Sequence, residues 1–310
     1  MGRITTRRKV QKVSLGDGAA DEYQAAAEVR VREDVLAVEE PLEIRVGGQS
    51  LAVTMRTPGH DVELAAGFLV SEGIIAAREQ FRTAIHCAGE ELNTYNVLDV
   101  NLAPGVALPS EDQRRSFYTT SSCGLCGKRS IESVRTVSSF DVAGDPLWLD
   151  AATVATYPDR LRAEQAAFDR TGGLHAAGLF DAASGELLVV REDVGRHNAV
   201  DKVVGWALLQ GRLPLRGTVL QVSGRASFEL VQKAVMAGIP MLTAVSAASS
   251  LAAELADEAG LTLVGFLRGD RMNVYTHAGR VVAAVEDRSA DGASLPARPQ
   301  GGAEVSTRSF

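Results

Sequence analysis

Residues 217–267 read GTVLQVSGRASFELVQKAVMAGIPMLTAVSAASSLAAELADEAGLTLVGFL, and this stretch decides the fold class. Three apolar runs, at 217–224, 240–247 and 261–267, have the length of buried strands. The stretches between them, FELVQKAVMAG and SLAAELADEAG, have helical spacing, and each ends in a glycine, as many helices do. This alternation predicts βαβ units and a mostly parallel sheet between helical layers, with ligand-binding loops at the carboxyl ends of the strands.

The same architecture is expected to begin after Pro146, where the rhythm of the sequence changes. VATYPDRLRAEQAAF, residues 154–168, has the spacing of one helix, and RHNAVDKVVGWALLQG, residues 196–211, has the spacing of another. Between them, 173–182 and 185–193 read as a strand pair. The larger part of the chain is therefore predicted to be an α/β domain.

The N-terminal part of the chain has a different pattern. Apolar and polar residues alternate through 29–40, 41–48 and 49–56, which predicts short antiparallel strands. An amphipathic helix is expected over 61–73, and two more strand-like stretches follow near 82–87 and 92–101. This region is predicted to form a smaller, β-rich domain.

Composition limits the classes of function. The chain has 310 residues, of which 45% are hydrophobic and 23% charged, and its net charge is −7, which argues against general nucleic-acid binding. No apolar run reaches the roughly 18 residues of a membrane span. The N-terminal MGRITTRRKV lacks the apolar stretch of a secretory signal, and three cysteines are too few for a disulfide scaffold. We therefore expect a cytoplasmic protein without a membrane partner.

Two cysteines stand three residues apart in SSCGLCGK, residues 121–128, at the end of a long loop expected over 103–127. Glycines beside them leave backbone amides open to an anion. A helix expected to begin near Lys128 would bring both sulfurs close to its N-terminus, where its dipole and the charge of Lys128 favour thiolate. Cys123 and Cys126 are therefore the candidate reactive residues.

The residues around this pair are compatible with several kinds of site. A structural zinc site normally needs four ligands and would have to recruit His86 and Cys87. A thioredoxin-like redox pair usually follows a strand closely, and two incidental cysteines rarely share a Gly/Ser loop. A sulfur relay needs an exposed, nucleophilic thiol on a mobile segment. Cys87 itself lies in the strand-like IHCAG and is expected to be buried and inert.

Five sequence blocks occur in a consistent order between about residues 30 and 285. They are FYTTSSCGLCGK (117–128), TGGLHAAGLF (171–180), REDVGRHNAVDKVVG (191–205), SGRASFELVQKA (223–234) and GFLRGDRMNVYT (265–276). Together they resemble the FdhD family, the formate dehydrogenase accessory sulfurtransferases. Neither terminal tail has a recognisable family pattern.

The resemblance implies a function. Such proteins accept sulfur from a cysteine desulfurase as a persulfide and pass it to the bis-molybdopterin guanine dinucleotide molybdenum cofactor before formate dehydrogenase receives that cofactor. Cys123 corresponds to the persulfide carrier, assisted by Cys126. The cofactor-binding segment corresponds to Phe266, Leu267, Arg268, Gly269, Asp270 and Arg271. GDP would be a partial mimic of the cofactor, no resident metal is expected, and the family forms homodimers.

The resemblance also implies that the larger domain has a cytidine-deaminase-like, three-layer α/β/α fold. With it, the expected organisation has five parts: a mobile arm (1–20), a β-rich domain (21–102), the cysteine loop with its following helix (103–145), a deaminase-like cofactor-binding α/β domain (146–285) and a disordered tail (286–310).

Other residues are candidates for binding. Arg268 and Arg271 follow an apolar strand and suit pyrophosphate, although an Arg-Gly-Asp turn is often a solvated hairpin tip. Two stretches stand at expected helix starts, where they either bind phosphate or serve as caps and ion pairs: 196–202 and SGRAS, 223–227. Glu192, Asp193 and His197 lie near each other in sequence and could form a metal site, although their spacing matches no known motif.

Two other functions remain as alternatives. One is a chaperone that holds the molybdenum cofactor without transferring sulfur. The other is a zinc nucleotide deaminase, for which His175 is the only matching ligand. Ala177 stands where deaminases have their proton-shuttling Glu, and the cysteine pair precedes His175 instead of following it. The order of residues therefore disfavours deaminase chemistry.

Overall fold

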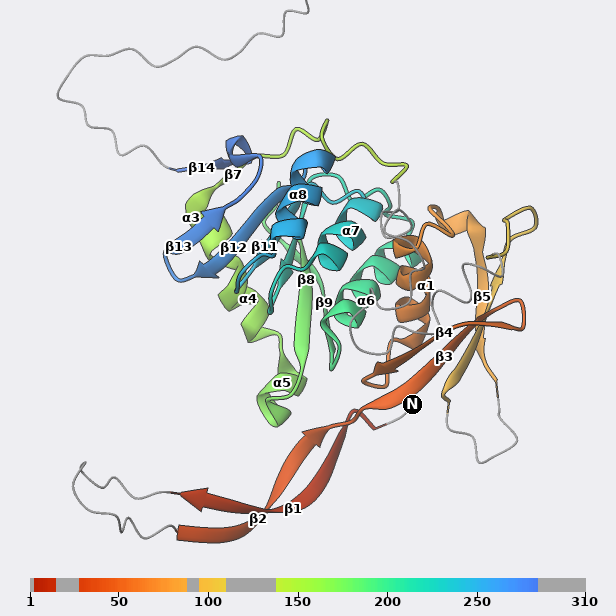
Figure 1. Ribbon diagram of the computed structural model, residues 1–310, viewed down its shortest axis with the longest axis vertical. Helices are drawn as coiled ribbons and strands as arrows, with labels where there is room; N and C mark the ends of the chain where they lie inside the picture. Colours follow the sequence, from red (N-terminus) through yellow and green to blue (C-terminus); the bar gives the residue numbers. More distant parts are fainter. Residues whose placement is uncertain (1–2, 15–27, 88–94, 110–137, 284–310) are drawn as a thin grey trace, which may run out of the picture.

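The structure is a computed structural model that describes residues 3–14, 28–87, 95–109 and 138–283. A six-stranded sheet is the centre of its larger part, with the strand order β13-β12-β11-β10-β8-β9 (Figure 1). The strands are β8 (His175–Asp181), β9 (Leu187–Asp193), β10 (Thr218–Val222), β11 (Met241–Ala244), β12 (Thr262–Arg268) and β13 (Arg271–Val274).

The central sheet is mixed, which corrects the prediction of a mostly parallel sheet. β10, β11 and β12 are parallel neighbours joined by helices, as the sequence indicates. The remaining pairings, β10 with β8, β8 with β9 and β12 with β13, are antiparallel. Short connections account for the two hairpins, because a tight turn can join only antiparallel strands.

Helices cover both faces of this sheet. Neighbouring residues of one strand point to opposite faces, and they fall into two separate apolar clusters. Leu220 and Leu242 pack in the cluster that contains α6 (Arg196–Leu209), α7 (Phe228–Met236) and α8 (Ser250–Ala259). Val219 and Met241 pack in the other, with α3 (Ala151–Ala155) and α4 (Tyr157–Ala163). The larger domain therefore has three layers.

The single helix predicted over 154–168 is wrong. Three short helices occupy this region: α3, α4 and α5 (Ala166–Thr171). Pro158 lies in the first turn of α4, where the missing N–H of proline has no cost. Proline in a helix interior would remove a backbone hydrogen bond, so α3 and α4 do not form one continuous helix. Gln165 has φ −85° and ψ 62°, which is not helical and separates α4 from α5. These breaks bend the segment around the edge of the sheet.

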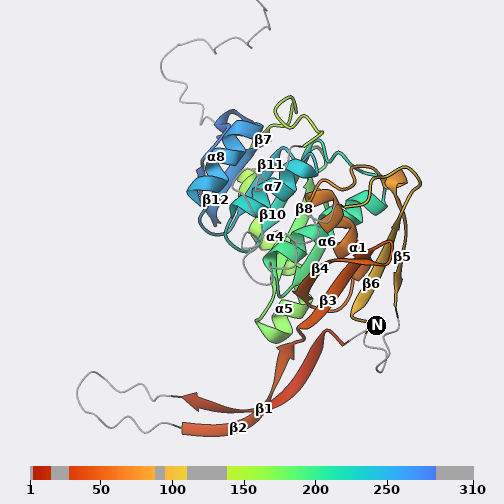
Figure 2. The same cartoon turned by 45° about the vertical axis from the view of Figure 1, so that its right-hand side comes forward.

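A second, four-stranded sheet forms the β-rich region, with the order β4-β3-β6-β5. Its strands are β3 (Glu40–Val46), β4 (Gln49–Arg56), β5 (Phe81–His86) and β6 (Val97–Leu102). The predicted helix is present as α1 (Asp61–Ser71), and it lies between this sheet and α6 (Figure 2). Side chains from this sheet, α1 and α6 share one apolar cluster, so the two sheets enclose a continuous core.

α1 and α6 cross at two glycines. A Cβ on Gly67 would lie 1.8 Å from the carbonyl oxygen of Asp201, and one on Gly205 would lie 1.8 Å from that of Glu63. No side chain fits at either position, so the backbones touch. This contact joins the β-rich region to the central sheet.

Residues 5–14, which fall within the predicted N-terminal arm, form a strand. β1 (Thr5–Ser14) pairs along its whole length with β2 (Glu28–Ala37), and this antiparallel ribbon projects away from the body (Figures 1 and 2). The smaller elements are η1 (Arg78–Gln80), β7 (Leu149–Asp150), η3 (Ala278–Arg280) and β14 (Val281–Val282). Within the described ranges, no helix has both the length and the apolar character of a membrane span.

Candidate functional site

A cavity of about 630 Å³ opens at the carboxyl ends of the parallel strands, the edge where the sequence predicts binding. Ser223 follows β10, Val245 follows β11, and Leu267 to Gly269 end β12. His175 begins the antiparallel β8 and therefore lies at the same edge. The remaining wall comes from the broken helical segment: Pro158, Asp159, Leu161, Arg162, Gln165, Phe168, Gly172, Gly173 and Leu174.

The lining combines an apolar wall with a few polar groups. Phe168 supplies aromatic surface, whereas Leu161 and Leu267 in the lining are almost wholly buried. Polar atoms come from Asp159, Arg162, Gln165, His175, Ser223 and Arg268. Small-molecule sites typically have this composition, and their volumes are about 300–1,000 Å³. The cavity is therefore suited to one planar, polar-edged group, such as a nucleobase or a pterin ring.

The segment 266–271 is divided between the cavity and the solvent. Leu267 is fully buried in the core, and Arg268 lines the cavity and donates its Nε–H to the carbonyl oxygen of Val245 at 3.0 Å. Asp270 and Arg271 stand at the tip of the β12–β13 hairpin with side chains 95% and 90% exposed. Gly269, with φ +55°, makes this tight turn. The six residues thus have different surroundings, and only part of the segment faces the cavity.

Phe266 has an unusual backbone conformation. Its φ is 51°, a value that costs energy for a bulky residue. The strand register shifts between Gly265 and Arg268, so the residue sits in a bulge. Its side chain is 46% exposed. Strained, exposed aromatic residues often occur at ligand sites, so Phe266 remains a candidate contact.

His175, the first residue of β8, is half-buried. Burial is the largest cause that lowers its pKa below 6.5, and the positive charges of Arg196 and His197 lower it further. Ser223 fixes the neighbouring backbone, because its Oγ accepts a hydrogen bond from the Ala176 amide at 2.9 Å. A neutral imidazole at this position can both donate and accept a hydrogen bond.

The start of α6, a candidate anion site in the sequence, is engaged within the fold. Lys202 and Asp193 form a buried ion pair of 2.7 Å. Asn198 donates to the Met55 carbonyl oxygen at 2.7 Å, and Asp201 accepts from Lys233 at 2.8 Å. These contacts support the structural interpretation of this segment.

The three residues considered as a metal site have separate partners. Glu192 accepts hydrogen bonds from the amides of Ala167 and Phe168 at 2.9 and 2.7 Å, and so caps α5. Asp193 pairs with Lys202, and His197 lies 2.6 Å from Glu229. In the part of the chain that the structure describes, no three His, Cys, Asp or Glu side chains gather closely enough to hold a metal ion.

Cys123, Cys126 and the helix expected from Lys128 lie outside the described residues, as does the tail at 286–310. The residue that follows the cysteine segment is anchored: Ser138 donates to the carbonyl oxygen of Val235, near the end of α7. α7 starts at the carboxyl edge of the sheet and runs back to the amino edge, so Ser138 lies at the edge opposite the cavity.

Cys87 differs from expectation. It follows the last residue of β5 and is half-buried, whereas the sequence predicts a buried thiol within a strand. The neighbouring His86 lies 3.8 Å from Asp61 and packs edge-on against Tyr95. His86 thus contacts Asp61 and Tyr95, and Cys87 is half-buried beside it.

Sequence reasoning missed the cavity wall formed by α4 and α5. Arg162, Gln165 and Phe168 all line the cavity. The available signal was Pro158, which marks a new helix and a change in chain direction. Nothing in the local sequence indicates which side of that helix meets the strands.

Two known proteins that are similar to this chain have the same description. A sulfur carrier protein FdhD from Mycolicibacterium paratuberculosis is 60% identical over 282 residues, which cover 90% of this chain and 99% of the relative. Another, from Streptomyces avermitilis, is 59% identical and covers 91% of this chain and 97% of the relative.

The fold has a counterpart among solved structures. The crystal structure of a candidate formate dehydrogenase accessory protein from Desulfotalea psychrophila superposes with a TM-score of 0.70 at 24% identity, over 90% of this chain and all of that one. The model of the FdhD/NarQ family matches residues 37–282. That match spans both sheets and the cavity, and it includes the cysteine segment. The chain therefore belongs to the FdhD/NarQ family.

Proposed function

We propose that this protein is a sulfur carrier in formate dehydrogenase maturation. In this proposal Cys123 receives sulfur from a cysteine desulfurase as a persulfide, and the outer sulfur passes to the bis-molybdopterin guanine dinucleotide molybdenum cofactor. The relatives named sulfur carrier protein, at 59–60% identity over nine-tenths of the chain, carry the proposal. The Cys-Gly-Leu-Cys sequence, with Lys128 beside it, supplies the thiol chemistry that such a role requires.

In the loading step the Cys123 thiolate attacks the outer sulfur of the donor's persulfide. The donor's sulfur–sulfur bond breaks, a new one forms on Cys123, and the donor cysteine leaves as a thiolate. Like any thiol exchange, this step depends on the fraction of Cys123 that is ionised. Cys126 assists by tuning or by relaying the sulfur.

The cavity at the carboxyl edge is the proposed site for one nucleotide end of the cofactor. Its volume, about 630 Å³, suits one such group and is too small for the whole cofactor. Phe168, which is only half-buried, would pack against the flat ring. The terminal nitrogens of Arg268 would bind a phosphate, since only its Nε is engaged by Val245 in the described residues.

Replacement of Cys123 tests the sulfur step. The protein is incubated with a cysteine desulfurase and cysteine, and the mass of the peptide that contains Cys123 and Cys126 is measured. We expect one added sulfur atom on the wild type and none on Cys123→Ala, together with loss of formate dehydrogenase activity in cells. Cys87→Ala is the matched control and should retain both. Full enzyme activity with Cys123→Ala would instead favour a cofactor chaperone without sulfur transfer.

The cavity is tested separately with GDP. Arg268→Ala should weaken GDP binding about tenfold or more, because a charge-assisted contact to phosphate is lost. Arg271→Ala, at the exposed hairpin tip, should weaken it much less. Isothermal titration measures both, and sulfur loading should stay intact in each variant. An equal effect of the two substitutions would contradict the cavity as the nucleotide site.

The proposed partners are a cysteine desulfurase as donor and formate dehydrogenase as recipient of the sulfurated cofactor. A homodimer is the proposed assembly. Sedimentation of the purified chain measures the assembly state independently of sulfur chemistry.

A further inference from the structure

A second cavity lies where the β1–β2 ribbon meets α5, the helix whose Phe168 lines the first cavity. Its volume is about 710 Å³. The lining has three arginines, two threonines and two aliphatic residues, and no carboxylate: Arg3, Ile4, Thr5, Thr6, Arg7, Val35 and Arg170. A site with cations and without acids is suited to an anionic ligand.

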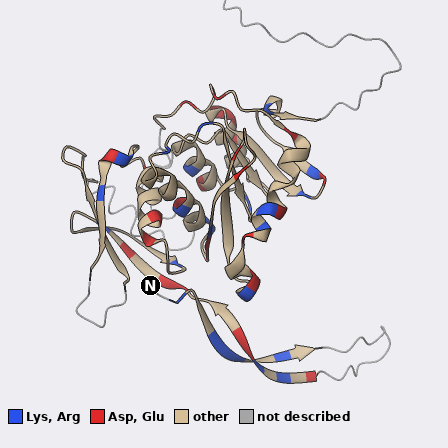
Figure 3. Ribbon diagram, turned by 180° about the vertical axis from the view of Figure 1, so that it is seen from behind, with Lys and Arg blue, Asp and Glu red and all other residues tan. Residues whose placement is uncertain are grey.

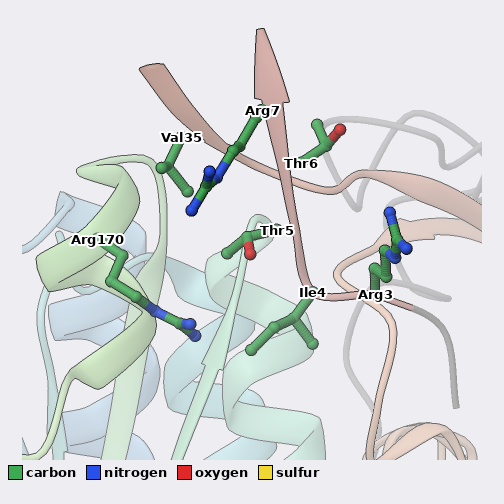
Figure 4. Close-up of a pocket in the computed structure, with 7 residues that line it drawn as sticks. All are labelled: Arg3, Ile4, Thr5, Thr6, Arg7, Val35 and Arg170. Carbon is green, nitrogen blue, oxygen red and sulfur yellow. The ribbon is translucent and has the colours of Figure 1, made fainter. Parts of the chain in front are cut away.

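The two sides of this cavity come from elements far apart in the sequence. Arg7 and Thr5 project from β1, and Arg170 projects from the last turn of α5. Figure 4 shows the guanidinium groups of Arg7 and Arg170 directed into the same space, with the side chain of Thr5 between them. Arg3 lies on the other side of β1 in this view. Two guanidinium groups and a hydroxyl therefore line one cavity, with Thr5 between the two arginines.

The guanidinium groups are available for a ligand. Arg7 is 3.6 Å from Glu33, a pair whose side chains are 77% and 60% exposed. Exposed pairs of this kind are weak, so a ligand carboxylate can replace Glu33. Among the described residues, no ion pair engages Arg3 or Arg170.

The charge of residues 3–14 contrasts with that of the whole chain, whereas β2 carries three acids and two arginines. Residues 3–14 contain no acid and five cations: Arg3, Arg7, Arg8, Lys9 and Lys12. The complete chain, in contrast, has a net charge of −7. Figure 3 shows both basic and acidic positions along the projecting ribbon. The outer edges of the two-stranded ribbon also have no strand partner within the described residues.

From this geometry we propose that the β1–β2 ribbon is a docking arm for an acidic, extended segment of a partner protein. One or more carboxylates of that segment enter the cavity between Arg7 and Arg170, where guanidinium groups bind them in a planar, bidentate way. The free ribbon edge offers backbone groups to the rest of the segment, as in other cases of strand addition. This inference does not rest on the proposed sulfur chemistry.

The lining favours a peptide over a nucleic acid. Single-stranded nucleic acids bind through aromatic side chains on which bases stack, and this cavity has none. Ile4 and Val35 instead offer aliphatic surface that suits the side chains between carboxylates. The negative charge of the whole chain also opposes a long polyanion.

The test uses the full-length protein and a fluorescein-labelled poly-glutamate peptide, with binding followed by fluorescence anisotropy at low salt. Arg7→Gln and Arg170→Gln should each weaken binding by up to about fivefold, the range for exposed charge pairs, and the double variant by about tenfold or more. Arg8→Gln is the matched control. It removes the same charge from the next residue of β1, whose side chain points to the opposite face. It should leave the affinity within about twofold of the wild type.

Three results would overturn the proposal. Equal weakening by Arg7→Gln and Arg8→Gln would show diffuse attraction and no defined site. A DNA oligonucleotide that binds more tightly than the peptide, with the same dependence on Arg7 and Arg170, would identify a nucleic-acid site. Absence of peptide binding by the wild type at low salt would contradict the role of the ribbon as a docking arm. Circular dichroism of each variant checks that the fold is retained.

Discussion

Replacement of Lys202 by Met is expected to destabilise the fold strongly, because it removes the cation from a buried network. Lys202 and Asp193 are 1% and 0% exposed and lie 2.7 Å apart. Lys202 also donates to the carbonyl oxygen of Thr57 at 3.0 Å, and Asp193 accepts from the Thr57 amide at 3.1 Å. Thr57 follows β4, so this network ties the β-rich region to β9 and α6.

The magnitude follows from what remains after the substitution. Met has nearly the volume of the Lys stem, so little packing is lost. Asp193 keeps its hydrogen bonds from Thr57, Gly195 and Asn198 but has no cation beside it. Removal of one partner from a buried pair costs about 3–5 kcal/mol, and the retained hydrogen bonds favour the lower end. Since domains are stable by only about 5–15 kcal/mol, a loss of about 3 kcal/mol is easily measured.

Urea unfolding followed by circular dichroism measures this loss. The midpoint should fall for Lys202→Met, while the slope with urea should stay constant. The double variant Asp193→Asn/Lys202→Met should be more stable than the sum of the two single changes predicts, by about 2 kcal/mol, because it leaves no unpaired charge. A loss below about 1 kcal/mol, or strict additivity, would refute the reasoning that the buried charges depend on one another.

Three further predictions concern stability and titration. Gly205→Ala should cost at least about 2 kcal/mol in the same urea assay, because its Cβ would lie 1.8 Å from a carbonyl oxygen, whereas Gly279→Ala, with open space around it, should change stability by less than about 0.5 kcal/mol. Glu63, although burial raises its pKa, has a pKa of about 2 because of hydrogen bonds, chiefly from Arg191. This carboxylate therefore stabilises the fold above about pH 4.5 and loses that effect as the pH falls toward 2, so Glu63→Gln should flatten the acid limb of stability by about 1–2 kcal/mol after allowance for solvent screening. His175 should titrate below its ordinary 6.5 in an NMR pH series, and a midpoint at or above that value would contradict its burial beside cations.

The βαβ part of the fold could be predicted because its pattern is strong and local. Leu220, Leu242 and Leu263 belong to continuous apolar runs, and the first two runs are each followed by a helical stretch ended by glycine. Such runs are typical of strands buried on both faces. The strand pair predicted at 173–182 and 185–193 is present as β8 and β9. The antiparallel pairing of β8 with β10 and of β12 with β13 was not predicted, because a buried strand has the same composition in either orientation.

The β1–β2 ribbon could not be predicted from periodicity. Nearly all residues of β1 are exposed, and charged residues occupy both faces, so no alternation of apolar and polar positions marks the strand. Backbone pairing with β2 and contact with α5 hold the ribbon, and neither leaves a pattern in the sequence. The candidate site could likewise be predicted only in part from the sequence. Arg268 could be located at the end of β12, but its neighbours from α4 and α5 depend on how the chain turns at Pro158.

The buried network and the cavity are linked through one strand pair. His175, which lines the cavity, pairs in register with Asp193, which accepts from Thr57 and Lys202. The first residue of β8 thus pairs through its backbone with a residue whose carboxylate is fixed by the β-rich region. A central sheet alone would leave this strand end exposed at the edge and free to fray. Packing of α1 against α6 and the Asp193 network remove that freedom, so the β-rich region contributes to the site by fixing the strand end from which His175 projects, although none of its residues lines the cavity.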